Sequence, residues 1–141
     1  MTDAASSPLC LRVGIWLLAV SLPLGLTLEA MHALKVQVYL GSVLRRELWT
    51  LAHAHGNLLG ILCLVFALLE ARIDDEVTRR RVDRWLALGA IAMPLGFLFG
   101  GVLNSEGDPS LGIVLVPLGG VCVFVALALA AIRFSQKQDS V

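Results

Sequence analysis

Charged side chains are scarce in this sequence, at 16% of its 141 residues, whereas an average soluble domain has about 25%. No charge of one sign dominates either, because 11 basic residues balance 11 acidic ones. A disordered tail needs a highly polar chain, and a nucleic-acid binder needs a basic surface. The composition therefore excludes both classes, and we expect no nucleic-acid partner.

Cysteines are also few and far apart in the sequence. Cys10, Cys63 and Cys122 lie in or beside apolar stretches, and no two of them form a CxxC pair. A thiol-ligated structural zinc site or a redox dithiol would need such closely spaced pairs. We therefore expect free thiols that pack as small hydrophobic side chains.

Apolar residues, by contrast, make up 57% of the chain, too large a share for one water-exposed core of this size. A bilayer core of about 30 Å requires a helix of about 20 apolar residues. Four runs meet this requirement, at about residues 13–40, 48–69, 85–103 and 111–132. Backbone groups cannot remain unpaired in lipid. The sequence therefore predicts an all-α fold, a bundle of four transmembrane helices forming one integral membrane domain over residues 1–141.

Basic residues are unequally divided between the two ends of this predicted bundle. Eight lie on the side that holds both termini and the 70–84 connection, and three lie on the opposite side. The eight are Arg12, Arg72, Arg79, Arg80, Arg81, Arg84, Arg133 and Lys137; the three are Lys35, Arg45 and Arg46. Because the cytoplasmic side of membrane proteins is enriched in Lys and Arg, we expect the N- and C-termini to be cytoplasmic.

Four ionisable residues fall within the predicted spans: Glu29, His32, His53 and His55. Such residues are costly in lipid and indicate a functional site by default. Glu29 and His32 are three residues apart and therefore neighbours on a helix. They share a stripe with Gly25 and other small residues, and we expect this stripe to face the bundle interior.

The second predicted helix places its two histidines on different faces. His53 shares a face with Gly56, Asn57 and Gly60, whereas His55 lies among leucines on nearly the opposite side. The pair therefore cannot chelate one metal ion from a helix. For His55 we expect contact with another helix or another chain.

The predicted depths of the histidines below the outer surface suggest a contact between the first and second helices. With the predicted bounds, His32 and His53 both lie on the order of 10 Å below the outer surface, so we expect them to meet, with Glu29 one turn deeper. Two imidazoles and a carboxylate suit a copper or zinc ion, two imidazoles suit a haem, and the group also suits a proton relay. A hydrogen-bonded polar cluster, with Glu29 accepting from His32 and Asn57 bridging to His53, is the non-functional alternative.

The segment LAHAHGNLLG at residues 51–60 resembles the AHAHxNLLG stretch of small bacterial membrane proteins related to subunit I of the haem–copper oxidases. In that superfamily the second membrane helix carries an Ala-His-Ala segment whose histidine is an axial haem ligand. The resemblance implies this role for His53, haem b as cofactor, a second ligand from His32 or another chain, and a location in the bacterial inner membrane. No histidine follows His55, so the oxidase copper site is not implied.

Three functions fit these observations. The first is a haem- or metal-binding, redox-associated module with cofactor ligands His32 and His53 and a metal ligand Glu29. The second is a non-catalytic accessory or assembly subunit of a larger membrane complex, and the third is a small transporter that works as a homo-oligomer. No serine elbow, phosphate loop or HExxH segment is present, so the sequence assigns no enzymatic activity.

Overall fold

The computed structural model describes residues 8–102, 104 and 107–138. Within these residues the chain is helical and contains no β-strand. Four long helices are α1 (Leu9–Ala33), α3 (Val43–Leu69), α4 (Glu76–Val102) and α5 (Leu115–Gln138). Shorter elements are α2 (Gln37–Leu40) and the 3-10 turns η1 (Glu70–Arg72) and η2 (Leu111–Val114). Four spans are long and apolar enough to cross a membrane, which confirms the predicted all-α, multi-pass fold.

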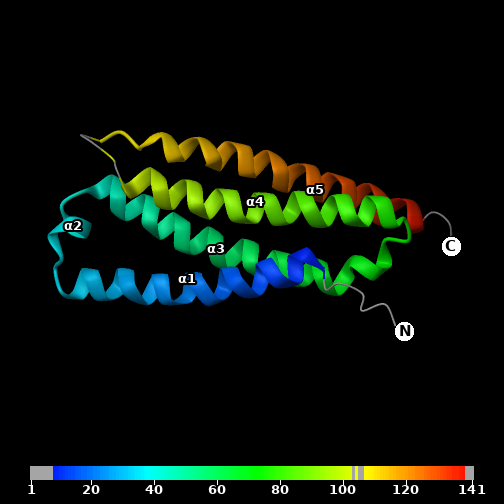
Figure 1. The fold of residues 1–141 in the computed structure, drawn as a ribbon, viewed down its shortest axis with the longest axis horizontal. Coiled ribbons are helices and arrows are strands. Elements are labelled where there is room, and N and C mark those ends of the chain that lie inside the picture. The colour runs from blue at the N-terminus through cyan, green and yellow to red at the C-terminus, as the bar shows by residue number, and fades with distance from the viewer. Residues whose placement is uncertain (1–7, 103, 105–106, 139–141) are drawn as a thin grey trace, which may run out of the picture.

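The long helices alternate in direction along the bundle (Figure 1). The start of α1, the η1 connection and the end of α5 lie at one end, which we call the terminal end. The opposite end, which holds α2 and the connection between α4 and η2, is called the turn end. Helix α3 packs between α1 and α4, and α5 packs mainly along α4. One side of α5 is therefore left without a partner helix in the described chain.

The first helix is shorter than predicted. It ends at Ala33 instead of continuing to residue 40, and Lys35 then adopts a left-handed backbone with φ of 53°. At 1.5 Å per residue, α1 is already about 37 Å long, more than the roughly 30 Å hydrocarbon core. The residues after Ala33 form a turn and the separate helix α2.

The next two helices begin earlier than the predicted positions 48 and 85. Helix α3 begins at Val43, where the hydroxyl of Ser42 accepts a hydrogen bond from the N–H of Arg45. Helix α4 begins at Glu76, where the carboxylate of Asp75 accepts from the N–H of Val77. Such caps satisfy backbone donors that the helix itself leaves free, so both helices extend past their apolar segments.

Glycines set the close approach of neighbouring helices. A Cβ on Gly14 of α1 would lie 2.8 Å from the carbonyl oxygen of Gly60 of α3. A Cβ on Gly89 of α4 would lie 2.6 Å from the carbonyl oxygen of Gly119 of α5. Small residues at such crossings let membrane helices pack backbone against backbone. The small-residue surfaces of the described chain are thus largely used within it.

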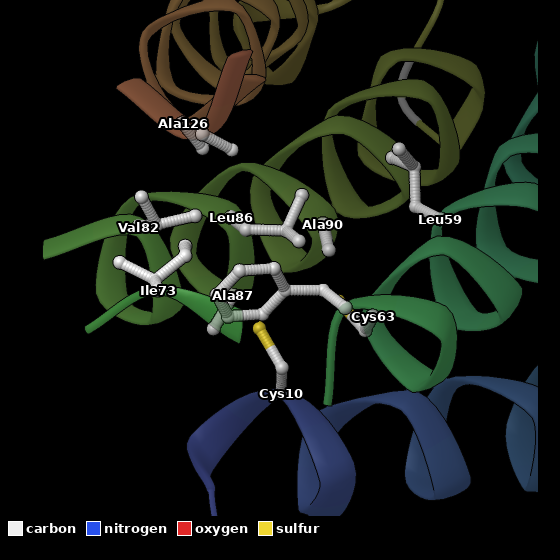
Figure 2. Packing of buried hydrophobic residues seen from close by; sticks show 11 residues of the cluster. Cys10, Leu59, Cys63, Ile73, Val82, Leu86, Ala87, Ala90 and Ala126 are labelled. Atoms are coloured by element: carbon white, nitrogen blue, oxygen red, sulfur yellow. The ribbon is translucent and has the colours of Figure 1, made fainter. Parts of the chain in front are cut away.

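The largest apolar core lies toward the terminal end. Figure 2 shows the thiol of Cys10 on α1 pointing into a cluster that includes Cys63 of α3 and Leu86 of α4. Cys10 and Cys63 are free and fully buried, and Cys122 is free and half-buried. The expectation of free thiols that pack as hydrophobic residues is confirmed. The structure adds that Cys10 and Cys63, though distant in sequence, belong to one cluster.

Candidate functional site

His53 lies about 15 Å from the start of α3 at 1.5 Å per residue, near the middle of the helix, and its ring is directed at α1. Its Nδ1 is 2.8 Å from the carbonyl oxygen of Ser21. Because a carbonyl can only accept, Nδ1 carries the proton and donates it. The nitrogen of the Asn57 side-chain amide lies 3.2 and 3.3 Å from the two ring nitrogens of His53. The Asn57 side chain thus lies within hydrogen-bond distance of the His53 ring.

Two glycines create the space that this cluster occupies. A Cβ on Gly25 would lie 2.3 Å from Cε1 of His53, and one on Gly56 would lie 1.9 Å from the hydroxyl oxygen of Ser21. Neither distance is compatible with an added methyl group, so the ring rests directly on the backbone of α1. The predicted hydrogen-bonded contact between His53 and Asn57 is present.

Asn57 leaves one polar atom unpaired. Its Oδ1 is buried and has no hydrogen-bond partner in the described part of the chain. A buried acceptor without a donor costs about 1–3 kcal/mol. The cluster is therefore satisfied at His53 but incompletely satisfied at Asn57.

His32 lies near the end of α1, away from His53. It is the next-to-last residue of α1, is exposed, and meets the ring of Tyr39 edge-on with a centroid distance of 6.4 Å. Gly25, which touches His53, precedes His32 by about 10 Å along α1 at 1.5 Å per residue. The structure therefore does not bring His32 and His53 together.

The observed ends of α1 and α3 explain why His32 and His53 are apart. The equal depth predicted for the two histidines depended on a first helix that continued to residue 40 and a second that began at 48. The observed ends at Ala33 and Val43 move His32 to the turn end and His53 toward the membrane centre.

Glu29 is also exposed, one turn before the end of α1. Beyond Pro23 it is Leu28, not Glu29, that is buried, so the predicted interior stripe is wrong for this part of the helix. Among the described residues, no group of three His, Cys, Asp or Glu side chains is close enough to hold a metal ion. The predicted set of Glu29, His32 and His53 is thus not assembled.

His55 packs between helices, as expected. Its Nδ1 bonds to the carbonyl oxygen of Leu51 on its own helix, at 2.9 Å. Its ring lies 4.8 Å from that of Phe97 on α4, between centroids, with a tilt of 38°. The contact with another helix is confirmed, and the second helix is α4.

The described residues supply at most one of the two haem ligands that the resemblance implies. An axial histidine needs a free ring nitrogen and room beside it for a flat macrocycle. In His53 the Nδ1–H donates to the carbonyl oxygen of Ser21, as ligating histidines commonly do with their second ring nitrogen, and the backbone of Gly25 lies nearest Cε1. The second predicted ligand, His32, is too distant to share a haem with it.

Sequence reasoning missed two residues that join distant segments. The guanidinium of Arg45 donates to the carbonyl oxygens of Val38 and Gly101 and to the side chain of Asn104. A cation is favourable at such helix C-termini. Arg45 thus ties α2, α3 and the end of α4 together, although the sequence showed it only as one of three basic residues on its side.

Asp83 is the second such residue. Its two carboxylate oxygens accept from the backbone N–H groups of Leu9, at 3.0 Å, and Cys10, at 2.8 Å. Pro8, at the N-cap of α1, makes no side-chain cap, so a carboxylate from α4 caps α1 instead. An acid next to an apolar span was the only sequence signal for this role.

No protein-family model, curated protein or solved structure matches this chain. Its function is therefore inferred from the geometry of its own residues.

Proposed function

We propose that the chain is a non-catalytic accessory or assembly subunit of a larger complex in the bacterial inner membrane. The observation that carries this proposal is the use of His53, whose ring nitrogens face Ser21 and Asn57 between two helices. A ligand or catalytic base needs a reactive atom that is free to meet a substrate. In this protein the central histidine serves helix packing instead.

The partner surface would be the open side of α5. Three large apolar residues on it, Leu118, Val121 and Phe124, are 57%, 60% and 72% exposed. Helix α5 packs mainly along α4, through glycines such as Gly89 and Gly119. A partner helix could extend the array by packing on this unoccupied side.

Native mass spectrometry of the protein extracted in mild detergent tests this function. We expect a particle heavier than the 15.1 kDa chain that contains a second kind of subunit. The double substitution Val121→Ala and Phe124→Ala should release the chain, because it removes apolar contact from α5. The matched control, Leu22→Ala and Leu26→Ala on α1, should leave the particle intact. A monomer in every preparation would contradict the proposal, and exact multiples of the chain mass would support a homo-oligomer instead.

The proposal also includes the orientation of the chain in the membrane. The terminal end carries the larger share of Lys and Arg, which favours cytoplasmic termini. Asp108 at the turn end and Arg80 near the terminal end are both exposed. In a cysteine-free background, an impermeant thiol reagent added to intact cells should label Asp108→Cys and not Arg80→Cys. The reverse pattern would overturn the orientation.

The competing function is the haem- or metal-binding module predicted from the sequence. It requires Nε2 of His53 to meet a cofactor, while Nδ1 can keep its bond to Ser21. An absorption spectrum separates the two functions, because only the competing one gives a haem band that depends on His53.

A further inference from the structure

An apolar groove runs along α1 from the terminal end to the middle of the bundle, where residues 91–98 of α4 form its other wall. Its volume is about 460 Å³, within the range of about 300–1,000 Å³ usual for ligand sites. Ala52 of α3 and Pro94 of α4 are among its lining residues. Trp16 and Val20 of α1 also line it and are 70% and 62% exposed. The groove therefore opens to the surface that lipid would contact.

Arg12 is the only charged residue in the lining of this groove. Its guanidinium makes no hydrogen bond or ion pair with the described residues. The carboxylate of Asp83, which reaches the start of α1, is bonded to the backbone of Leu9 and Cys10. A cation without a partner among the described residues thus lies at the edge of an otherwise apolar surface.

The depth of Arg12 is that of lipid headgroups. Helix α1, about 37 Å long, exceeds the roughly 30 Å hydrocarbon core by about 4 Å at each end. Arg12 is three residues from its start, about 4.5 Å along the axis, and so lies at the hydrocarbon boundary. Trp16 follows one turn deeper, where tryptophan is favoured in membrane proteins.

The dimensions of the groove suit one hydrocarbon chain. From Arg12 to Leu24, the α1 side of the groove is about 18 Å long, close to one leaflet of a 30 Å core. Its lining is apolar apart from Arg12 and Ser21, which suits a hydrocarbon chain that packs against apolar groups at about 4–4.5 Å.

We propose that this groove binds an anionic phospholipid, with one acyl chain along α1 and α4 and the headgroup phosphate at Arg12. A guanidinium binds the oxygens of a phosphate group through paired N–H donors. Basic positions at the edge of membrane helices recognise acidic lipid headgroups in this manner. The site does not depend on the partner proposed for α5.

Fluorescence quenching by brominated lipids tests the site. The substitutions Trp49→Phe and Trp85→Phe leave Trp16 as the only tryptophan, and the protein is placed in phosphatidylcholine vesicles. Equal mole fractions of brominated phosphatidylglycerol or brominated phosphatidylcholine are then compared. We expect Trp16 to show an apparent affinity about fivefold higher for the anionic lipid, the ratio that about 1 kcal/mol per basic residue gives.

A matched control uses Trp85, which is 41% exposed on α4 near the same end and is absent from the groove lining. With Trp16→Phe and Trp49→Phe, Trp85 reports the lipid preference of the terminal end outside the groove, and we expect Arg12→Gln to leave that preference unchanged. Arg12→Gln should reduce the preference at Trp16 to that at Trp85, with unchanged circular dichroism. Equal quenching of Trp16 by both lipids, a preference that survives Arg12→Gln, or protection of Trp16 from both lipids would each overturn the proposal.

Discussion

The Nδ1 of His53 on α3 lies 2.8 Å from the carbonyl oxygen of Ser21 on α1, and this bond joins two helices near the middle of the membrane. An imidazole at that depth is costly unless its polar atoms are paired. Gly25 and Gly56 bring the backbones close enough for the pairing. The sequence feature that most resembles a cofactor site is therefore part of the contact between α1 and α3.

The fit between His53 and Gly25 can be measured with a double-mutant cycle. Gly25→Ala should lower the free energy of unfolding by about 1–3 kcal/mol, because the new methyl group overlaps the His53 ring. His53→Ala should cost a similar amount, because it leaves Asn57 unpaired. In the double variant the overlap disappears, so the two costs should be less than additive. Reversible unfolding in mixed detergent micelles measures all three.

Gly120→Ala is the control for this cycle, since a Cβ there meets no atom within 4 Å. We expect it to be neutral or slightly stabilising, because alanine has the higher helix propensity. Strict additivity of the Gly25 and His53 substitutions would show that the two residues do not touch.

Asp83→Asn tests the cap that α4 supplies to α1. The substitution keeps the shape but removes the charge that accepts from Leu9 and Cys10. We expect a loss of about 1 kcal/mol in the free energy of unfolding, as for a typical N-cap. Hydrogen exchange should also become faster at the start of α1. Glu76→Gln, which removes only an exposed pair with Arg80, should have a smaller effect; equal effects would argue against the cap.

Arg45→Lys tests the junction at the turn end. Lysine keeps the charge but cannot reach the carbonyl oxygens of Val38 and Gly101 and the Asn104 side chain at once. We expect faster hydrogen exchange in α2 and at the end of α4, measured by mass spectrometry. The neighbouring Arg46→Lys is the control and should leave exchange unchanged. No difference between the two variants would contradict the assigned role of Arg45.

Asp75 should make stability depend on pH. A hydrogen bond from the hydroxyl of Thr78, aided by the N–H of Val77 and by Arg133, holds the pKa of Asp75 below its ordinary value. Its stabilising effect is therefore present above the ordinary Asp pKa of about 4 and is lost as pH falls through the lower pKa of the folded protein. Asp75→Asn should be less stable than the parent at pH 6, and thermal unfolding should show that this difference narrows in acid. A difference independent of pH would contradict this account.

The sequence predicted the features that depend on local composition. The lengths of the apolar runs were sufficient to predict four membrane-spanning helices. Helical spacing was sufficient to place Asn57 beside His53 and to place His55 on a different face. The end of α1 was not predictable in this manner, because residues 34–40 contain neither glycine nor proline. That end coincides with the left-handed turn at Lys35.

The contacts of Asp83 and Arg45 were unpredictable for a different reason. Each joins segments more than fifty residues apart, so no local pattern indicates it. Glu29 was misplaced because the helical period alone did not show that Leu28 would be the buried neighbour. Packing between segments that are distant in sequence determines both the contacts of Asp83 and Arg45 and the exposure of Glu29.

The absorption spectrum of the purified protein tests the central claim most directly, namely that His53 is a helix-packing residue and not a cofactor ligand. The protein would be expressed in haem-replete cells and compared with His53→Ala and His55→Ala. We expect all three spectra to show only the aromatic protein band, with His53→Ala differing in stability alone. A Soret band in the parent protein that persists in His55→Ala and disappears in His53→Ala would contradict the claim.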